Sequence, residues 1–187
     1  MKNYFASILC CILLVIASGC TTMYSAVVDE RNIRTVASDT KIKAIILDAF
    51  IQDDTVKTFD IDIACYYGQV YLIGEYDTEK QKNRAVEIAG DVEGVKGVTT
   101  YLLKKKDGDP CGTMDNLAIK AKVKAKLIKD EDIWSTNVDV TIVQCNVVFT
   151  GLVGSDKEIE KIIAHAKSVG GVRSVKSFLK VAPHHNQ

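Results

Sequence analysis

The sequence predicts an α+β protein made of two copies of one small module, and three observations support this fold class. Shifting the sequence by 77 positions brings two halves into register without a gap. In each half the spacing of apolar residues changes from that of a helix to that of a strand and back. Turn and helix-cap residues recur at equivalent positions. Because internal repetition indicates a duplicated unit, we expect each half to fold as helix, strand, strand, helix, strand, with a three-stranded mixed sheet packed on two helices.

The register of the repeat rests on identical residues, which are mostly apolar or glycine. Chance does not keep so many such positions at one offset. The identical pairs are Val70 and Val147, Gly74 and Gly151, Ala89 and Ala166, Val92 and Val169, Gly94 and Gly171, Val95 and Val172, Val98 and Val175, and Leu102 and Leu179.

The first helix of each copy is predicted from apolar residues four positions apart, which lie on one helical face. In the second copy they are Ile119, Val123 and Leu127, and in the first copy Ile42, Ile46 and Phe50.

A hairpin with one buried face follows, because Val138, Val140 and Ile142 alternate with polar residues. The turn of the first copy is predicted at Tyr67-Gly68, where glycine accepts a positive φ. Cys145 stands opposite Gly68, so we expect the second turn to shift onto Cys145-Asn146.

The second helix of each copy is predicted from its start and stop signals. Ser155 and Glu158 form a capping box, which Thr78 and Gln81 mirror in the first copy. Gly94 and Gly171 are predicted to cap the ends of these helices. The last strands are expected through Val95, Val98 and Leu102, and through Val172, Val175 and Leu179.

The N-terminus has the pattern of an export signal. One basic residue, Lys2, precedes an apolar stretch over residues 4–16, which is too short to span a bilayer. The stretch ends at Ala17-Ser18-Gly19-Cys20, which resembles a lipobox, where the cysteine is lipidated. We expect a signal peptide over 1–19, a linker over 20–38, a first domain over 39–105, a linker over 106–114, a second domain over 115–183 and a tail over 184–187.

The repeated module resembles the BON domain, named for bacterial OsmY and nodulation proteins. Its hairpin exit appears as 70–74 and 147–151, and its Gly-Val-x-x-Val motif as 94–98 and 171–175. A lipobox followed by two such domains is similar to the dual-BON-domain outer-membrane lipoproteins of the division site. The resemblance implies a protein that supports envelope integrity and binds anionic phospholipid through the first helix of its second domain. Ala118 stands where relatives have an aromatic residue.

The first helix of the second copy carries an unusual charge. Residues 116–130 hold five lysines and one aspartate, a net charge of +4, whereas residues 39–53 hold two lysines and three aspartates, a net charge of −1. A thin apolar stripe between basic rims suits an anionic membrane surface, although alanine and lysine also favour any solvated helix. The candidate phospholipid-binding residues are Leu117, Ala118, Lys120, Ala121, Lys122, Lys124, Ala125, Lys126, Ile128 and Lys129.

Catalytic and metal sites are not predicted. His165 lies within a helix, and His184-His185 supplies only two ligands on a tail. After the export signal and the lipid take three of the six cysteines, Cys65, Cys111 and Cys145 remain, so at least one thiol is unpaired. We expect small buried or partly exposed thiols. The formal charge of zero predicts no general attraction to nucleic acid, and no cofactor is expected.

We therefore expect a monomeric, non-enzymatic protein anchored through Cys20 to the periplasmic side of the outer membrane. Thr21 stands where many inner-membrane lipoproteins have aspartate. Its expected partner is an anionic phospholipid membrane. One alternative is an adaptor that docks onto envelope proteins, and another is a chaperone-like factor of the osmotic stress response.

Overall fold

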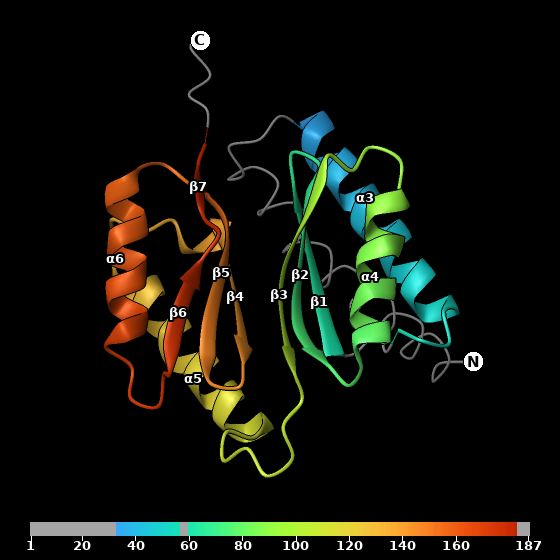
Figure 1. The fold of residues 1–187 in the computed structure, drawn as a ribbon. Helices are drawn as coiled ribbons and strands as arrows, with labels where there is room; N and C mark the ends of the chain where they lie inside the picture. Colours follow the sequence, from blue (N-terminus) through green and yellow to red (C-terminus); the bar gives the residue numbers. More distant parts are fainter. Residues whose placement is uncertain (1–32, 57–59, 183–187) are drawn as a thin grey trace, which may run out of the picture.

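The structure is a computed structural model that describes residues 33–56 and 60–182. Its elements form four layers, with helices outside and two sheets between them (Figure 1). Each sheet is covered on its outer face by two helices, as the sequence predicts. The α+β fold with two helix-strand-strand-helix-strand repeats is confirmed.

The first domain holds a three-stranded mixed sheet in the order β1-β2-β3. Strands β1 and β2 are antiparallel, and β2 and β3 are parallel. The elements are α3 (Ile33–Gln52), β1 (Ile61–Tyr66), β2 (Gln69–Tyr76), α4 (Glu79–Asp91) and β3 (Gly97–Lys104).

The second domain repeats this arrangement in the order β4-β5-β6, with the short strand β7 also paired to β5. The last predicted strand is thus divided in two. The elements are α5 (Thr113–Lys129), the 3-10 turn η2 (Ser135–Asn137), β4 (Val138–Val143), β5 (Asn146–Val153), α6 (Asp156–Lys167), β6 (Ser174–Ser177) and β7 (Lys180–Val181).

Each domain has its own hydrophobic core between sheet and helices. The apolar residues that predicted the first helices are buried in these cores, as expected. They are Ile42, Ile46 and Phe50 in α3, and Ile119, Val123 and Leu127 in α5.

The two sheets pack against each other through their other faces. Tyr71 and Ile73 of β2 meet Val148 of β5 in a third apolar cluster. The ring centroids of Tyr71 and Phe178 lie 5.5 Å apart. The expectation of a hairpin with one buried face is therefore wrong for β2 and β5, which are buried on both faces. A strand buried on both faces loses the alternation of apolar and polar residues, and this is the pattern of residues 70–73.

Both hairpin turns keep the same geometry, so the predicted shift onto Asn146 is wrong. Tyr67 and Gly68 have positive φ angles of 55° and 79°, and Gln144 and Cys145 have 48° and 59°. Two successive positive φ angles are typical of a type I′ hairpin turn. A side-chain oxygen of the preceding helix holds each turn. Asp39 accepts from the Gly68 N–H at 2.8 Å, and Asn116 accepts from the Cys145 N–H at 2.9 Å.

The second helices begin as predicted but end earlier. Ser155 accepts from the Glu158 N–H at 3.2 Å, although the Glu158 carboxylate binds the N–H of Gly154 instead of completing the capping box. Gly94 and Gly171 do not cap these helices, because α4 ends at Asp91 and α6 at Lys167. With φ angles of 91° and 93°, these two glycines instead form tight turns that lead into the last strands.

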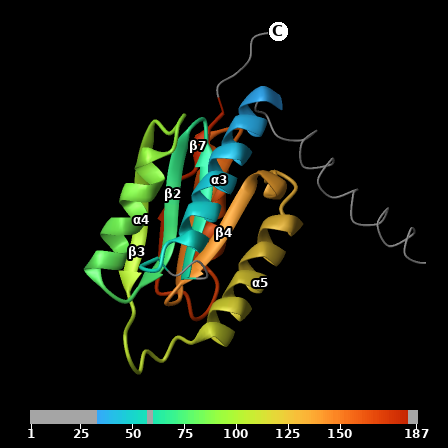
Figure 2. The ribbon, with the colours of Figure 1, turned by 90° about the vertical axis from the view of Figure 1, so that its right-hand side faces the viewer.

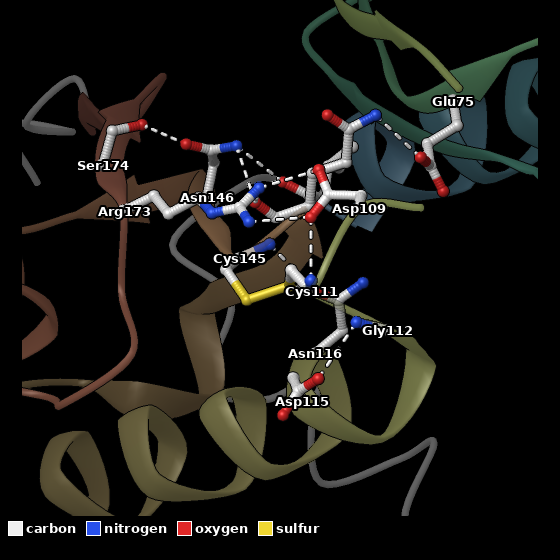
Figure 3. Close-up of a disulfide and its surroundings, with 12 residues drawn as sticks. Glu75, Asp109, Cys111, Gly112, Asp115, Asn116, Cys145, Asn146, Arg173 and Ser174 are labelled. Carbon is white, nitrogen blue, oxygen red and sulfur yellow. Dashed lines mark hydrogen bonds and ion pairs between the residues drawn. A yellow bond between two sulfur atoms is a disulfide. The ribbon is translucent and has the colours of Figure 1, made fainter. Parts of the chain in front are cut away.

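A disulfide joins the linker between the domains to the hairpin turn of the second domain (Figure 3). Cys111 and Cys145 form this bond with Cα atoms 5.8 Å apart, within the ordinary range. On the same linker, Asp109 accepts two hydrogen bonds from the Arg173 guanidinium, at 2.7 and 2.8 Å. The Arg173 guanidinium lowers the pKa of Asp109 to about 2. Covalent and ionic bonds thus fix the linker at the point where α5 begins.

The sequence expectation of thiols is wrong for Cys111 and Cys145. Cys65 is buried, and its Sγ lies 3.4 Å from the Asp39 carboxylate. The disulfide was not predicted because its two residues are 34 positions apart and only the fold brings them together.

Candidate functional site

Helix α5, which carries the candidate lipid-binding residues, is held firmly at both ends. At its start, the Gly112 N–H donates to the Asp115 carboxylate at 3.0 Å, next to the disulfide. At its end, Asp130 lies 2.8 Å from His165 Nε2 and 3.4 Å from Lys161 Nζ, both on α6. The hydrogen bond with His165, followed by the one from the Asp132 N–H, lowers the pKa of Asp130. His165 therefore serves to attach α5 to α6.

The outward face of α5 combines apolar and basic side chains. Leu117 and Ile128 are 59% and 69% exposed, and they lie on the same face of the helix. Lys120 is half-buried. The other candidate residues are exposed: Ala118, Ala121, Lys122, Lys124, Ala125, Lys126 and Lys129. The structure thus brings all ten predicted residues to the part of α5 that does not pack on the sheet.

The lysines lie on the two flanks of this apolar stripe. Lys120 and Lys124 border a hollow at the junction of the two domains, whose lining includes Asp62 and Asp139. On the opposite flank, Lys126 and Lys129 lie near His165. Successive residues of an α-helix are about 100° apart, which places Ala121 and Ala125 between the two flanks that carry the lysines.

Within the part of the chain that the structure describes, no α5 lysine forms an ion pair or a hydrogen bond with another residue. In contrast, Lys82 and Lys161 on the second helices pair with carboxylates. Like charges three or four residues apart on one helix destabilise it slightly. The cluster therefore contributes nothing to the folded state through ion pairs and is available to a ligand of opposite charge.

Large apolar side chains are also exposed outside α5, and sequence analysis missed most of these. On α3 they are Ile33, Ile45, Leu47 and Ile51, and in the loop after α5 Trp134 is half exposed. Helical periodicity predicted only the buried face of α3. The apolar residues that fall outside this periodicity could have predicted an exposed apolar surface on the same helix.

Other predicted features are only partly within the described residues. Cys20 and the His184-His185 pair lie outside them. Among the residues that are described, no group of three or more metal-ligating side chains is placed to bind a metal ion. A helix long and apolar enough to cross a bilayer was likewise not found in that part of the chain.

Comparison with known proteins identifies the family. The model of the BON domain matches twice, over residues 38–104 and 115–183. The chain therefore belongs to the BON-domain family, as its repeat and motifs suggested.

Curated relatives span much of the chain. Osmotically-inducible protein Y of Escherichia coli (strain K12) is 33% identical over 144 residues, which cover 76% of this chain and 72% of the relative. An Anaplasma centrale protein described as an uncharacterized protein in the gshII 5′ region is 29% identical over 115 residues, which cover 61% of this chain and 76% of that protein.

Among solved structures, the chain is similar to the C-terminal domain of CdsD, the structural protein of the Type III secretion system of Chlamydia trachomatis. The TM-score is 0.32 at 13% identity, and the match covers 78% of this chain and 67% of that chain. A second structure of CdsD gives a TM-score of 0.33 at 13% identity, with 77% and 93% coverage.

Proposed function

We propose that this protein is a lipid-anchored component of the bacterial envelope that binds anionic phospholipid through α5 and supports the integrity of the outer membrane. The observation that carries the proposal is the exposed apolar stripe of α5, flanked by lysines that have no partner among the described residues. In this proposal the two domains act as a rigid support that presents one helix, and no reaction is catalysed.

An anionic bilayer satisfies both parts of this surface. Each lysine close to anionic headgroups contributes about 1 kcal/mol of attraction. The aliphatic stems of the lysines extend along the apolar side chains while their charges remain in water. Leu117 and Ile128 then enter the boundary between headgroups and acyl chains, as expected for an amphipathic helix that lies in the membrane plane.

The disulfide between Cys111 and Cys145 agrees with the proposed compartment, because disulfides are typical of proteins outside the reducing cytoplasm. The similarity to osmotically-inducible protein Y fits a role under osmotic stress. Attachment through Cys20 to the periplasmic side of the outer membrane would hold the chain close to phospholipid and leave α5 to make a second contact.

Vesicle binding tests the proposal. The mature chain from Thr21 onward, which lacks the acylated cysteine, is expected to sediment with vesicles that contain phosphatidylglycerol and not with pure phosphatidylcholine. Binding is expected to weaken as salt rises, because salt screens exposed charges. Equal binding to both vesicles, or none to either, would contradict the proposal and favour an adaptor that docks onto envelope proteins.

A further inference from the structure

The exposed apolar side chains of this protein are concentrated on one helix of each repeat. Eight large apolar residues are exposed in the part of the chain that is described, and none of them lies on α4 or α6. Four lie on α3, three on α5 and one in the loop that follows α5: Ile33, Ile45, Leu47, Ile51, Met114, Leu117, Ile128 and Trp134. Exposed apolar residues that share one surface are typical of a binding site, whereas single ones are not.

Helices α3 and α5 cover the outer faces of different sheets, but both lie beside the edge of the sandwich that β1 and β4 form. Figure 2 shows both helices, with β4 visible between them. The hollow between the domains is lined by Lys43 of α3 and by Lys120 and Lys124 of α5. The flank of α3 that carries Lys43 and the flank of α5 that carries Lys120 therefore face the same opening.

Helical spacing places two apolar residues on this flank of α3. Residues four apart lie one above the other on a helix, so Lys43, Leu47 and Ile51 form a row. The repeat matches it to the row of Lys120, Lys124 and Ile128 on α5. Leu47 thus occupies the position that Lys124 has on α5. At this one position α3 presents an apolar residue where α5 presents charge, whereas the positions before and after it carry lysine and isoleucine on both helices.

We propose that α3 is a second membrane-contact element, and that Leu47 and Ile51 enter the same anionic bilayer that α5 binds. This inference rests on the proposed function. In this arrangement α5 supplies the electrostatic attraction and α3 adds apolar contact. The membrane then touches both domains, and their fixed packing determines the orientation of the protein on the bilayer.

The distribution of charge favours a bilayer over a second copy of this chain as the partner of this surface. A two-fold contact between copies would bring the α5 lysines of one copy close to the α3–α5 surface of the other. The exposed acids on the two helices are Asp48 and Asp115. They are outnumbered by the exposed lysines of the same helices, which are Lys41, Lys43, Lys122, Lys124, Lys126 and Lys129. The α3–α5 surface of a second copy would therefore repel these lysines more than attract them.

The matched control lies on α3 itself. Leu47 and Ile45 are 40% and 41% exposed, but they lie on opposite flanks of the helix, about 160° apart. We expect Leu47→Gln with Ile51→Gln to weaken binding of the mature chain to phosphatidylglycerol vesicles about tenfold, because two apolar side chains no longer leave water. Ile45→Gln is expected to leave binding unchanged.

Circular dichroism melts of both variants check that the fold is retained. Unchanged binding after Leu47→Gln with Ile51→Gln, beside normal binding by the unaltered chain, would overturn the role of α3 and leave that of α5 standing. Equal weakening by Ile45→Gln would also overturn it. Absence of binding by the unaltered chain would overturn both proposals. A lipid-free dimer that Leu47→Gln with Ile51→Gln dissociates, measured by light scattering, would identify a second copy as the occupant.

Discussion

Replacing Lys122, Lys124 and Lys126 with glutamate is expected to abolish binding to anionic vesicles while the protein remains folded. All three side chains are exposed and lie away from the core that α5 forms with its sheet. Losing three attractions of about 1 kcal/mol each weakens binding at least about a hundredfold, and the added repulsion weakens it further. Lys120 is left unchanged because it is half-buried at the domain junction, whereas Lys124, which lines the same hollow, is exposed.

A charge-matched variant tests whether vesicle binding depends on where the lysines lie or only on how many there are. Lys80, Lys157 and Lys167 are exposed on α4 and α6, and their replacement by glutamate changes the net charge by the same amount. This control is expected to retain most of the binding in a sedimentation assay at fixed salt. If both triple variants lose binding equally, the attraction belongs to the net charge of the protein and α5 is not the binding element.

Gly151→Ala is expected to destabilise the protein strongly, by roughly 3 kcal/mol or more. A Cβ atom at Gly151 would lie 2.1 Å from the carbonyl oxygen of Asn137, so the backbone of β4 or β5 must move. Its φ of 143° is also one that other residues rarely adopt. Gly74 has the same environment in the first domain, with a Cβ 1.9 Å from the Asp60 carbonyl oxygen.

Urea unfolding of the mature chain measures this effect, and Gly170→Ala is its control. A Cβ at Gly170 meets no other atom within 4 Å. We expect that variant to stay within about 0.5 kcal/mol of the unaltered protein, as exposed substitutions usually do. Equal unfolding midpoints for Gly151→Ala and Gly170→Ala would mean that the close approach of position 151 to the Asn137 carbonyl oxygen does not affect stability.

The sequence was sufficient for the features that local spacing and the repeat determine. Ile119, Val123 and Leu127 predicted the buried face of α5, and the structure confirms it. The same periodicity placed Leu117 and Ile128 outside the core, where they are exposed. These predictions succeed because the burial of a helical face depends on spacing within one element.

Features that depend on contacts between distant segments could not be predicted in this way. The disulfide requires the linker to reach the turn at Gln144-Cys145. The packing of the two sheets brings Tyr71 next to Phe178, more than a hundred residues away. A signal for this packing existed in the apolar run of residues 70–73, which does not alternate and therefore indicates a strand buried on both faces.

The most direct test of the central claim is whether the apolar stripe of α5 enters the bilayer. Ala121 lies in the middle of this stripe, so Ala121→Trp in a Trp134→Phe background provides a single tryptophan reporter. Its emission is expected to shift to the blue with phosphatidylglycerol vesicles and to be quenched by brominated acyl chains. Ala164→Trp on α6, in the same background, is expected to do neither. A reporter at position 121 that stays in water while the protein is bound would contradict the account.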